Sequence, residues 1–259
     1  MNNAKTEIKR WGIVVIQSLG DKDIKTGEQL FNDILRFKQY CQKESFASFY
    51  DVHSVAEFED ALKCTLKSLN SGDIVTLQIE AHGNDNGIVL SNGEIVSWKH
   101  FYDLIRPINI EIGHLLIVVM AMCKSIAMIS SIDPLKRAPY RAFICTTRDV
   151  TAEEIVNAFS AFYQEYFNLL DIVKAMHALQ CEVVDSNGYS PFQLLSAECV
   201  FDETFSDLRN VDSLAMSHLI REDKRITTSS LSQKAEELKH FLKKTHDISY
   251  NYYNFKDLY

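Results

Sequence analysis

Short apolar runs alternate with amphipathic segments along most of this chain. The runs with the length and β-branched character of strands cover residues 11–17, 48–53, 73–81, 114–122, 142–147 and 192–201, and the last also fits a strand that continues as helix. Helical periodicity covers residues 26–43, 54–69, 97–106, 124–131 and 151–180. Strands that alternate with helices predict an α/β fold with a mainly parallel sheet of about six strands and helices on both faces.

Capping and turn residues mark several boundaries of these elements. Ser54 with Glu57, and Thr151 with Glu154, have the spacing of a capping box, so each pair predicts the start of a helix. Pro107 predicts the end of the helix that begins near Ser97. Asn92-Gly93 stands between two apolar pairs, which is typical of a β-hairpin. Residues 186–188 (Ser-Asn-Gly) predict a further turn.

The alternation of strands and helices divides the chain into two parts. Residues 1–205 contain it and are predicted to form one domain. Residues 206–259 are predicted to be a helical C-terminal extension, with helices at 213–221 and 231–246 and a Tyr-rich tail. We expect this extension to pack back on the same domain, and binding of a regulatory partner is the alternative.

Composition and charge narrow the class of protein. The chain has 259 residues, 46% of them hydrophobic, and a formal net charge of −8, which favours a globular protein that does not bind nucleic acid directly. The longest apolar run, residues 115–122, is too short to span a bilayer, and the N-terminal segment lacks a signal-peptide core. We therefore expect a cytoplasmic protein with no membrane partner.

Neither a cofactor nor a metal site is expected. The six cysteines include no CxxC pair, and we expect most of them to be small buried side chains. The histidines other than His82 show no metal-ligand spacing, and phosphate-binding and dinucleotide-binding glycine motifs are absent from the sequence.

Two reactive residue types follow consecutive apolar runs. His82-Gly83 closes the run at 73–81, and Cys123 closes the run at 114–122. The carboxyl ends of parallel strands lie at one edge of a sheet, where His82 could take the proton of the Cys123 thiol and pass it to a leaving amine. A helix that starts after Cys123 would favour its thiolate, and the N–H groups of Gly83 and Cys123 would form an oxyanion hole.

Each of these residues also has a purely structural interpretation. A histidine at a strand end is often a solvated or capping residue, and a cysteine after an apolar strand is often packed in a core. The combination at neighbouring strand ends, with a glycine and a hairpin between them, favours the catalytic interpretation. Asp149 could line a pocket for a basic substrate residue, but capping of the helix near Thr151 is the favoured role.

The two motifs and their surroundings resemble a known group of enzymes. LQIEAHGNDNGIVLSNGEIV followed by LLIVVMAMCKS is similar to the caspase-like cysteine peptidases of the caspase, separase and gingipain clan, especially their bacterial CHAT-type members. FICTTRDVTAEEIVNAFSAFYQEYF and FQLLSAECVF are similar to later elements of those domains, so that the resemblance spans residues 11–201. It implies a caspase-like three-layer sandwich with a His82–Cys123 dyad and with Gly83 in the oxyanion hole.

The resemblance also implies a function. It points to an intracellular cysteine endopeptidase (a thiol protease of the hydrolase class) that cleaves a specific protein, is switched on by a protein partner and acts in bacterial antiviral defence or cell death. Ala121 stands where metacaspases have an acidic residue, and the caspase Gln and Gly around the cysteine are missing, so cleavage after Asp, Arg or Lys does not follow. A catalytically silent caspase-like scaffold or binding module, and an unrelated α/β enzyme or nucleotide-binding protein, are the alternatives.

Overall fold

The computed structural model describes residues 10–37, 45–133, 136–205 and 250–256. The expected helices at 213–221 and 231–246, and part of the one expected at 26–43, lie outside these ranges. The chain divides into two compact units, Met1–Ile132 with Pro139–Leu195 and Asp133–Ala138 with Ser196–Tyr259. The candidate site belongs to the first unit, and each unit is described on its own.

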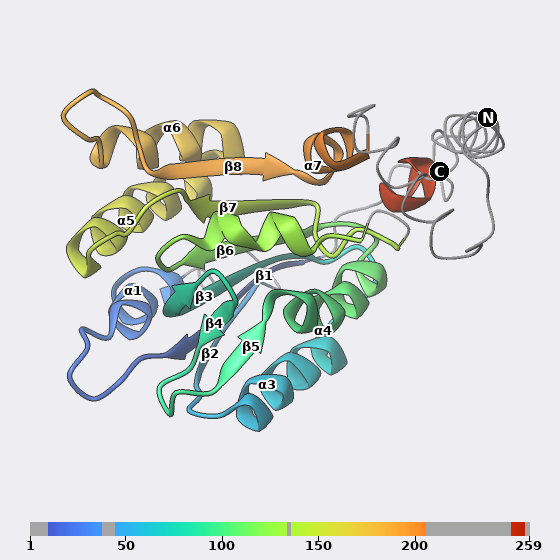
Figure 1. Cartoon of the computed structure of the whole chain (residues 1–259), viewed down its shortest axis with the longest axis horizontal. Helices are drawn as coiled ribbons and strands as arrows, with labels where there is room; N and C mark the ends of the chain where they lie inside the picture. The colour runs from blue at the N-terminus through green and yellow to red at the C-terminus, as the bar shows by residue number, and fades with distance from the viewer. Residues whose placement is uncertain (1–9, 38–44, 134–135, 206–249, 257–259) are drawn as a thin grey trace, which may run out of the picture. The chain divides into compact units, whose positions relative to one another are not determined.

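The first unit is built around a mixed, mainly parallel sheet (Figure 1). Its strands are β1 (Trp11–Ser18), β2 (Phe46–Asp51), β3 (Ile74–Asn84), β4 (Gly87–Val89), β5 (Ile95–Ser97), β6 (Leu116–Ala121), β7 (Ala142–Thr146) and β8 (Phe192–Ser196). The order across the sheet is β2-β1-β3-β6-β7-β8, with parallel pairing from β2 to β7. The N–H of Thr147, after β7, donates to the carbonyl of Pro191, before β8, so β8 runs antiparallel. The predicted α/β class is confirmed.

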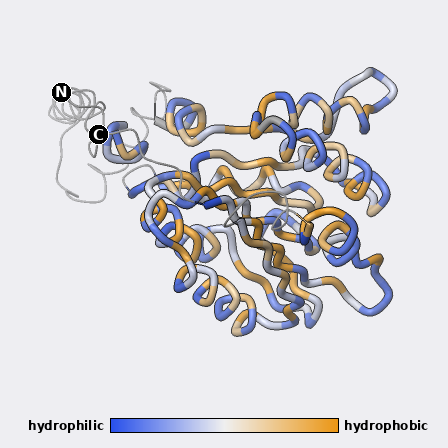
Figure 2. The backbone as a smooth tube through the Cα atoms, turned by 180° about the vertical axis from the view of Figure 1, so that it is seen from behind, coloured by the Kyte–Doolittle hydropathy of each residue, from blue (hydrophilic) through white to orange (hydrophobic). Residues whose placement is uncertain are grey.

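Helices cover both faces of this sheet (Figure 1). Helices α1 (Thr26–Asp33), α5 (Ala152–Leu169) and α6 (Ile172–Glu182) share a hydrophobic core with one face of the sheet. Helices α3 (Val55–Ser68) and α4 (Trp98–Glu111) pack together and contact the other side. The strands between them carry most of the hydrophobic stretches along the backbone (Figure 2). This arrangement makes three layers, as predicted, because a parallel sheet is stable only when both of its faces are covered.

The second unit combines segments that are distant in sequence. Helix α7 (Ala197–Phe205) follows β8, so the alternative of a strand that continues as helix is confirmed for residues 192–201. The rings of Phe201 and Tyr253 lie 5.2 Å apart, and the guanidinium of Arg137 lies 4.1 Å from the ring of Tyr252. The described part of the tail therefore packs within this unit.

Two element boundaries differ from the prediction around α4. The helix continues through Pro107 to Glu111, so the predicted end at Arg106 is wrong. Proline removes one backbone donor, but Ile105 and Ile108 on either side are both buried, and this apolar stripe stabilises the continued helix. His114 has φ +64° and lies in the turn after α4, so the next strand begins only at Leu116.

The predicted helix at 151–180 is two helices. Leu170 adopts a left-handed conformation with φ +54°, which ends α5. Asp171 then caps α6 by accepting hydrogen bonds from the N–H groups of Val173 and Lys174. Its carboxylate is a strong N-cap acceptor, and this cap starts a new helix after one left-handed residue.

The two expected capping boxes differ in completeness. Thr151 and Glu154 form the full reciprocal box at the start of α5, as predicted. Ser54 accepts a hydrogen bond from the Glu57 N–H at the start of α3, but the Glu57 carboxylate accepts from the N–H of His53, one residue earlier than the box requires. Both helices nevertheless begin where the sequence predicted.

Replacing Thr151 by alanine is expected to destabilise the protein by about 1 kcal/mol, because the Glu154 N–H loses its acceptor. Urea unfolding of Thr151→Ala measures this loss. Thr151→Ser keeps the oxygen and should retain most of the stability, so equal losses in the two variants would contradict the capping role.

Candidate active site

The register between β3 and β6 positions the two predicted catalytic residues. Glu80 of β3 is opposite Ala121 of β6, at the last position where these strands pair. His82 and Cys123 each lie two residues further on. This register brings the backbones of both residues to the carboxyl edge of the sheet.

The strand that carries His82 does not end there. β3 leaves the parallel sheet after Ala81 and continues as an antiparallel partner of β4, with His82 opposite Val89 and Gly83 opposite Ile88. The expected hairpin forms between β4 and β5, with Gly93 at φ +87°. The prediction that β3 closes at Ala81 is therefore wrong, since the hairpin supplies backbone partners as far as Asn84.

Gly83 brings the two motifs into direct contact. A Cβ atom at Gly83 would lie 2.6 Å from the carbonyl oxygen of Cys123 and 3.0 Å from Cγ of Met122. Only a residue without a side chain fits so close to another backbone segment. Glycine at this position therefore has a packing reason in addition to the predicted role of its N–H group.

The segment after Cys123 is fixed to β7. Lys124 has φ +51°, and a 3-10 helix (Ser125–Ser131) follows it, where the sequence predicted a helix without specifying its type. Ser125 and Thr146 exchange hydrogen bonds, with the Thr146 N–H donating to the Ser125 hydroxyl over 2.9 Å. The Thr146 hydroxyl donates to the carbonyl of Met122. These contacts fix the backbone on both sides of Cys123.

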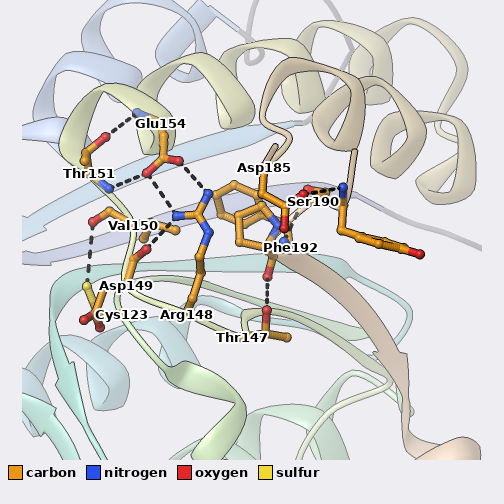
Figure 3. Close-up of polar contacts among 12 residues, drawn as sticks. Cys123, Thr147, Arg148, Asp149, Val150, Thr151, Glu154, Asp185, Ser190 and Phe192 are labelled. Atoms are coloured by element: carbon orange, nitrogen blue, oxygen red, sulfur yellow. Dashed lines mark hydrogen bonds and ion pairs between the residues drawn. The ribbon is translucent and has the colours of Figure 1, made fainter. Parts of the chain in front are cut away.

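The loop from β7 to α5, residues 147–151, lies across the Cys123 thiol (Figure 3). The Cys123 Sγ donates to the carbonyl oxygen of Val150 over 3.7 Å, and the Lys124 N–H donates to the carbonyl of Arg148 over 3.4 Å. The Arg148 guanidinium points away from the thiol and pairs with Glu154 at 2.7 Å. The thiol of Cys123 is thus half-buried and already hydrogen-bonded to backbone.

Asp23 is a member of the site that sequence reasoning missed. Its Oδ2 lies 3.0 Å from Nε2 of His82 and accepts the Gly20 N–H over 2.8 Å. The hydrogen bond from His82, followed by the one from Gly20, holds the pKa of Asp23 below its ordinary value. Asp23 follows β1, the neighbour of β3, so the order of these strands was the signal that could have found it.

Asp149 lies at the same edge, on the loop beside Cys123. Its carboxylate is exposed and lies 3.8 Å from Nζ of Lys124. Thr151 provides the capping oxygen of α5, so the contacts of Asp149 are with Lys124 and not with the helix start. Its predicted contact with substrate stays a prediction.

The other described cysteines differ from Cys123 in their surroundings. Cys145 is buried in β7, and burial raises the pKa of its thiol to about 12. Cys64, Cys181 and Cys199 are exposed on helices. Within the described ranges, no three His, Cys, Asp or Glu side chains are grouped so that they could hold a metal ion.

Comparisons with known proteins leave the family open. No protein-family model matches the chain, and no curated protein matches its sequence. In the part of the chain that the structure describes, no helix has the length and apolar character required to cross a membrane.

Gly83→Ala is expected to destabilise the protein by about 1–3 kcal/mol, because the new methyl group would collide with the Cys123 carbonyl. It should also change the rate at which a small electrophile alkylates Cys123, measured by mass spectrometry of the labelled peptide. In Gly188→Ala a Cβ would meet open space at φ +82°, so this control costs backbone strain without a collision and should leave Cys123 labelling unchanged. Equal effects in both variants would contradict the close approach.

Asp23→Asn is expected to have a pH-dependent effect on stability. The pKa of Asp23 in the folded protein lies below its ordinary value of 3.8, so the stabilisation from its charge is complete above that pH and is lost as the pH falls through the lowered pKa. The difference in Tm between wild type and Asp23→Asn should therefore stay constant above about pH 5 and shrink as the pH falls below 3.8. Asp21→Asn, in the same loop, should show no such trend, and a difference that stays constant with pH would exclude the Asp23–His82 bond as its source.

Proposed function

We propose that this chain is a cysteine endopeptidase of the caspase-like type. The observation that carries the proposal is the meeting of the two motifs, in which Gly83 lies against the Cys123 backbone and His82 and Cys123 follow paired strands at one edge of the sheet. The three-layer fold, the hairpin after His82 and the carboxyl-edge position also support it. Cytoplasmic location, a single protein substrate, an activating protein partner and a role in bacterial antiviral defence or cell death belong to the same proposal, on the resemblance alone.

The reaction would use these residues as follows. Cys123 Sγ attacks the carbonyl carbon of the scissile peptide bond, and His82 takes the thiol proton. The oxyanion accepts hydrogen bonds from the N–H groups of Gly83 and Cys123. His82 then donates the proton to the leaving amine, and water hydrolyses the thioester to release the acid and restore the thiol.

Asp23 extends this proposal to a third residue. It engages Nε2 of His82, which leaves Nδ1 as the nitrogen available to the thiol. A carboxylate on the far nitrogen fixes the orientation and tautomer of the ring and stabilises the imidazolium that forms during attack. Asp23 is therefore proposed as a positioning residue.

The surroundings of Cys123 bear on substrate choice. Asp149 and Lys124 carry opposite charges beside the thiol and lie 3.8 Å apart, and both are exposed. A basic substrate residue would compete with Lys124 for Asp149, and so we propose that Asp149 favours a basic side chain near the cut.

A catalytically silent binding module is the second candidate, and one observation favours it. The Cys123 thiol is engaged by the Val150 carbonyl, and loop 147–151 lies across it. In a peptidase this contact must open before attack, whereas a binding module needs no such opening.

Cys123→Ala is expected to lower peptide cleavage at least 10³-fold, because the nucleophile is removed. Asp23→Asn should lower kcat by about 10²-fold with a smaller change in KM, since it acts on ring orientation. The measurement is cleavage of a broad peptide library, paired with labelling by a peptide chloromethyl ketone mapped to a residue.

Cys199→Ala is the matched control and should retain full cleavage, because Cys199 is exposed on α7. Cleavage that survives in Cys123→Ala would exclude this nucleophile. A chain that neither cleaves nor labels at Cys123, with cell extract supplied as a source of partners, would favour the silent module.

A further inference from the structure

A carboxylate is buried on β3 two residues before His82. Glu80 is 1% exposed and lies on the sheet face covered by α1 and α5. Its Oε2 accepts the Thr26 hydroxyl over 2.7 Å, and its Oε1 accepts Nε2 of Gln78 over 2.6 Å. No Lys, Arg or His within the described residues pairs with it. Burying a carboxyl group without a neighbouring cation costs free energy, so packing alone does not explain a glutamate at this position.

The cluster around Glu80 extends to α5. The Tyr163 hydroxyl donates to Oε1 of Gln78 over 2.7 Å, which links α5 to Glu80 through one amide. Burial raises the pKa of Glu80 to about 7, while the bonds from Gln78 and Thr26 oppose that shift. Both hydroxyls of the cluster can donate or accept, so it can re-pair when Glu80 gains a proton.

Helix α1 begins directly on this cluster. Lys25 at its N-cap makes no side-chain capping bond, since its Nζ donates to the Leu19 carbonyl, and the Glu28 N–H donates to Oε1 of Gln17. A Cβ atom at Gly27 would lie 2.6 Å from Cγ of Glu80 and 3.1 Å from Oε1 of Gln17. The first turn of α1 is therefore anchored on side chains of β1 and β3 and not by a cap of its own.

The loop that carries Asp23 joins this turn to β1. Residues 19–25 lie between Ser18 and Thr26, and the Thr26 N–H donates to the Ile24 carbonyl over 2.9 Å. The Asp23 N–H donates to the Gly20 carbonyl over 3.1 Å. Thr26 and Asp23 are thus three residues apart, joined by consecutive hydrogen-bonded turns.

We propose that Glu80 is a positioning residue for His82: through Thr26 it fixes the first turn of α1, and with that turn the loop that holds Asp23 against the ring. The inference rests on the proposed function for its effect on catalysis, while the coupling of Glu80 to Asp23 and His82 stands independently. Protonation of Glu80 removes one acceptor oxygen from the cluster, so the coupling changes near neutral pH.

The other titratable groups near Glu80 do not account for a change of charge in this cluster near neutral pH. Tyr163 on α5 has a pKa raised well above its ordinary range, by burial first and then by the charges of Glu80 and Tyr166, so it stays protonated. Asp51 on β2 reaches the cluster only through Gln17, at 3.4 Å. Glu28 on α1 is exposed, and His82 is two residues further along β3.

The test compares Glu80→Gln, Thr26→Val and the control Glu28→Gln in the full chain. Glu28→Gln removes an exposed carboxylate from the first turn of α1 without touching the cluster. The readout is an NMR titration that follows the carboxyl carbon of Asp23 and the ring signals of His82. An imidazole ring ordinarily titrates at about pH 6.5 on its own, so the curves of wild type and each variant are compared. In wild type, both signals should carry an additional contribution from the carboxyl of Glu80, whose pKa is about 7.

We expect Glu80→Gln to lose the contribution of Glu80 and to keep its fold, because glutamine can preserve both hydrogen bonds. Thr26→Val should move the pKa of Asp23 up toward its ordinary value, because the loop is released. Glu28→Gln should match wild type in both respects. Asp23 and His82 signals that are unchanged in folded Glu80→Gln and Thr26→Val would overturn the proposal.

Cleavage separates this inference from the proposed function. If the chain is a peptidase, Thr26→Val should lower kcat about tenfold with little change in KM, as expected for a misplaced catalytic group. Cleavage that depends on Cys123 but is unaffected in Thr26→Val would refute the role of Glu80 and leave the peptidase proposal in place. If no peptide is cleaved, the titration alone decides the coupling.

Discussion

Parallel pairing of β3 with β6 is the constraint on which the candidate site depends. The two strands are hydrogen-bonded from Val75 opposite Leu116 to Glu80 opposite Ala121. A shift of this register by one residue would send every side chain of β6 to the other face and move Cys123 out of its close approach to Gly83. The buried apolar residues on both faces of β6 make such a shift costly, so the hydrophobic core also fixes the position of the thiol.

Three further segments position the reactive side chains at that edge. The hairpin from β4 to β5 holds the end of β3, the loop before α1 brings Asp23 to His82, and the loop before α5 lies over the thiol. Each segment is held by hydrogen bonds between polar groups, which an apolar core cannot provide. Buried or half-buried hydrogen bonds of this kind depend on geometry, and they are costly to leave unpaired. Positional accuracy at the site therefore comes from polar contacts, while stability comes mainly from burial.

The sequence predicted the parts of this arrangement that depend on local pattern. Apolar runs located most strands of the sheet, and Thr151 with Glu154 located the start of α5. Contacts between segments distant in sequence could not be predicted, because the residues next to Asp23 and His82 give no sign that these two side chains pair. The alternation in Thr76, Gln78 and Glu80 is typical of a strand with one solvated face, yet α1 and α5 bury that face. Local propensity also failed at Pro107 and Leu170, where packing and capping decided the helix ends.

The change of partner within β3 has a mechanical consequence. Up to Ala81 the strand belongs to the large sheet, and from His82 onward it belongs to the hairpin. Cys123, by contrast, follows a strand of the large sheet and is fixed to β7 through its neighbours. β3 thus passes from the large sheet to the hairpin between Ala81 and His82, and each of the two carries one reactive group. The separation of imidazole and thiol is therefore set by how the hairpin is held against the large sheet, through contacts such as the Ser91 N–H to the Ser18 hydroxyl over 3.0 Å.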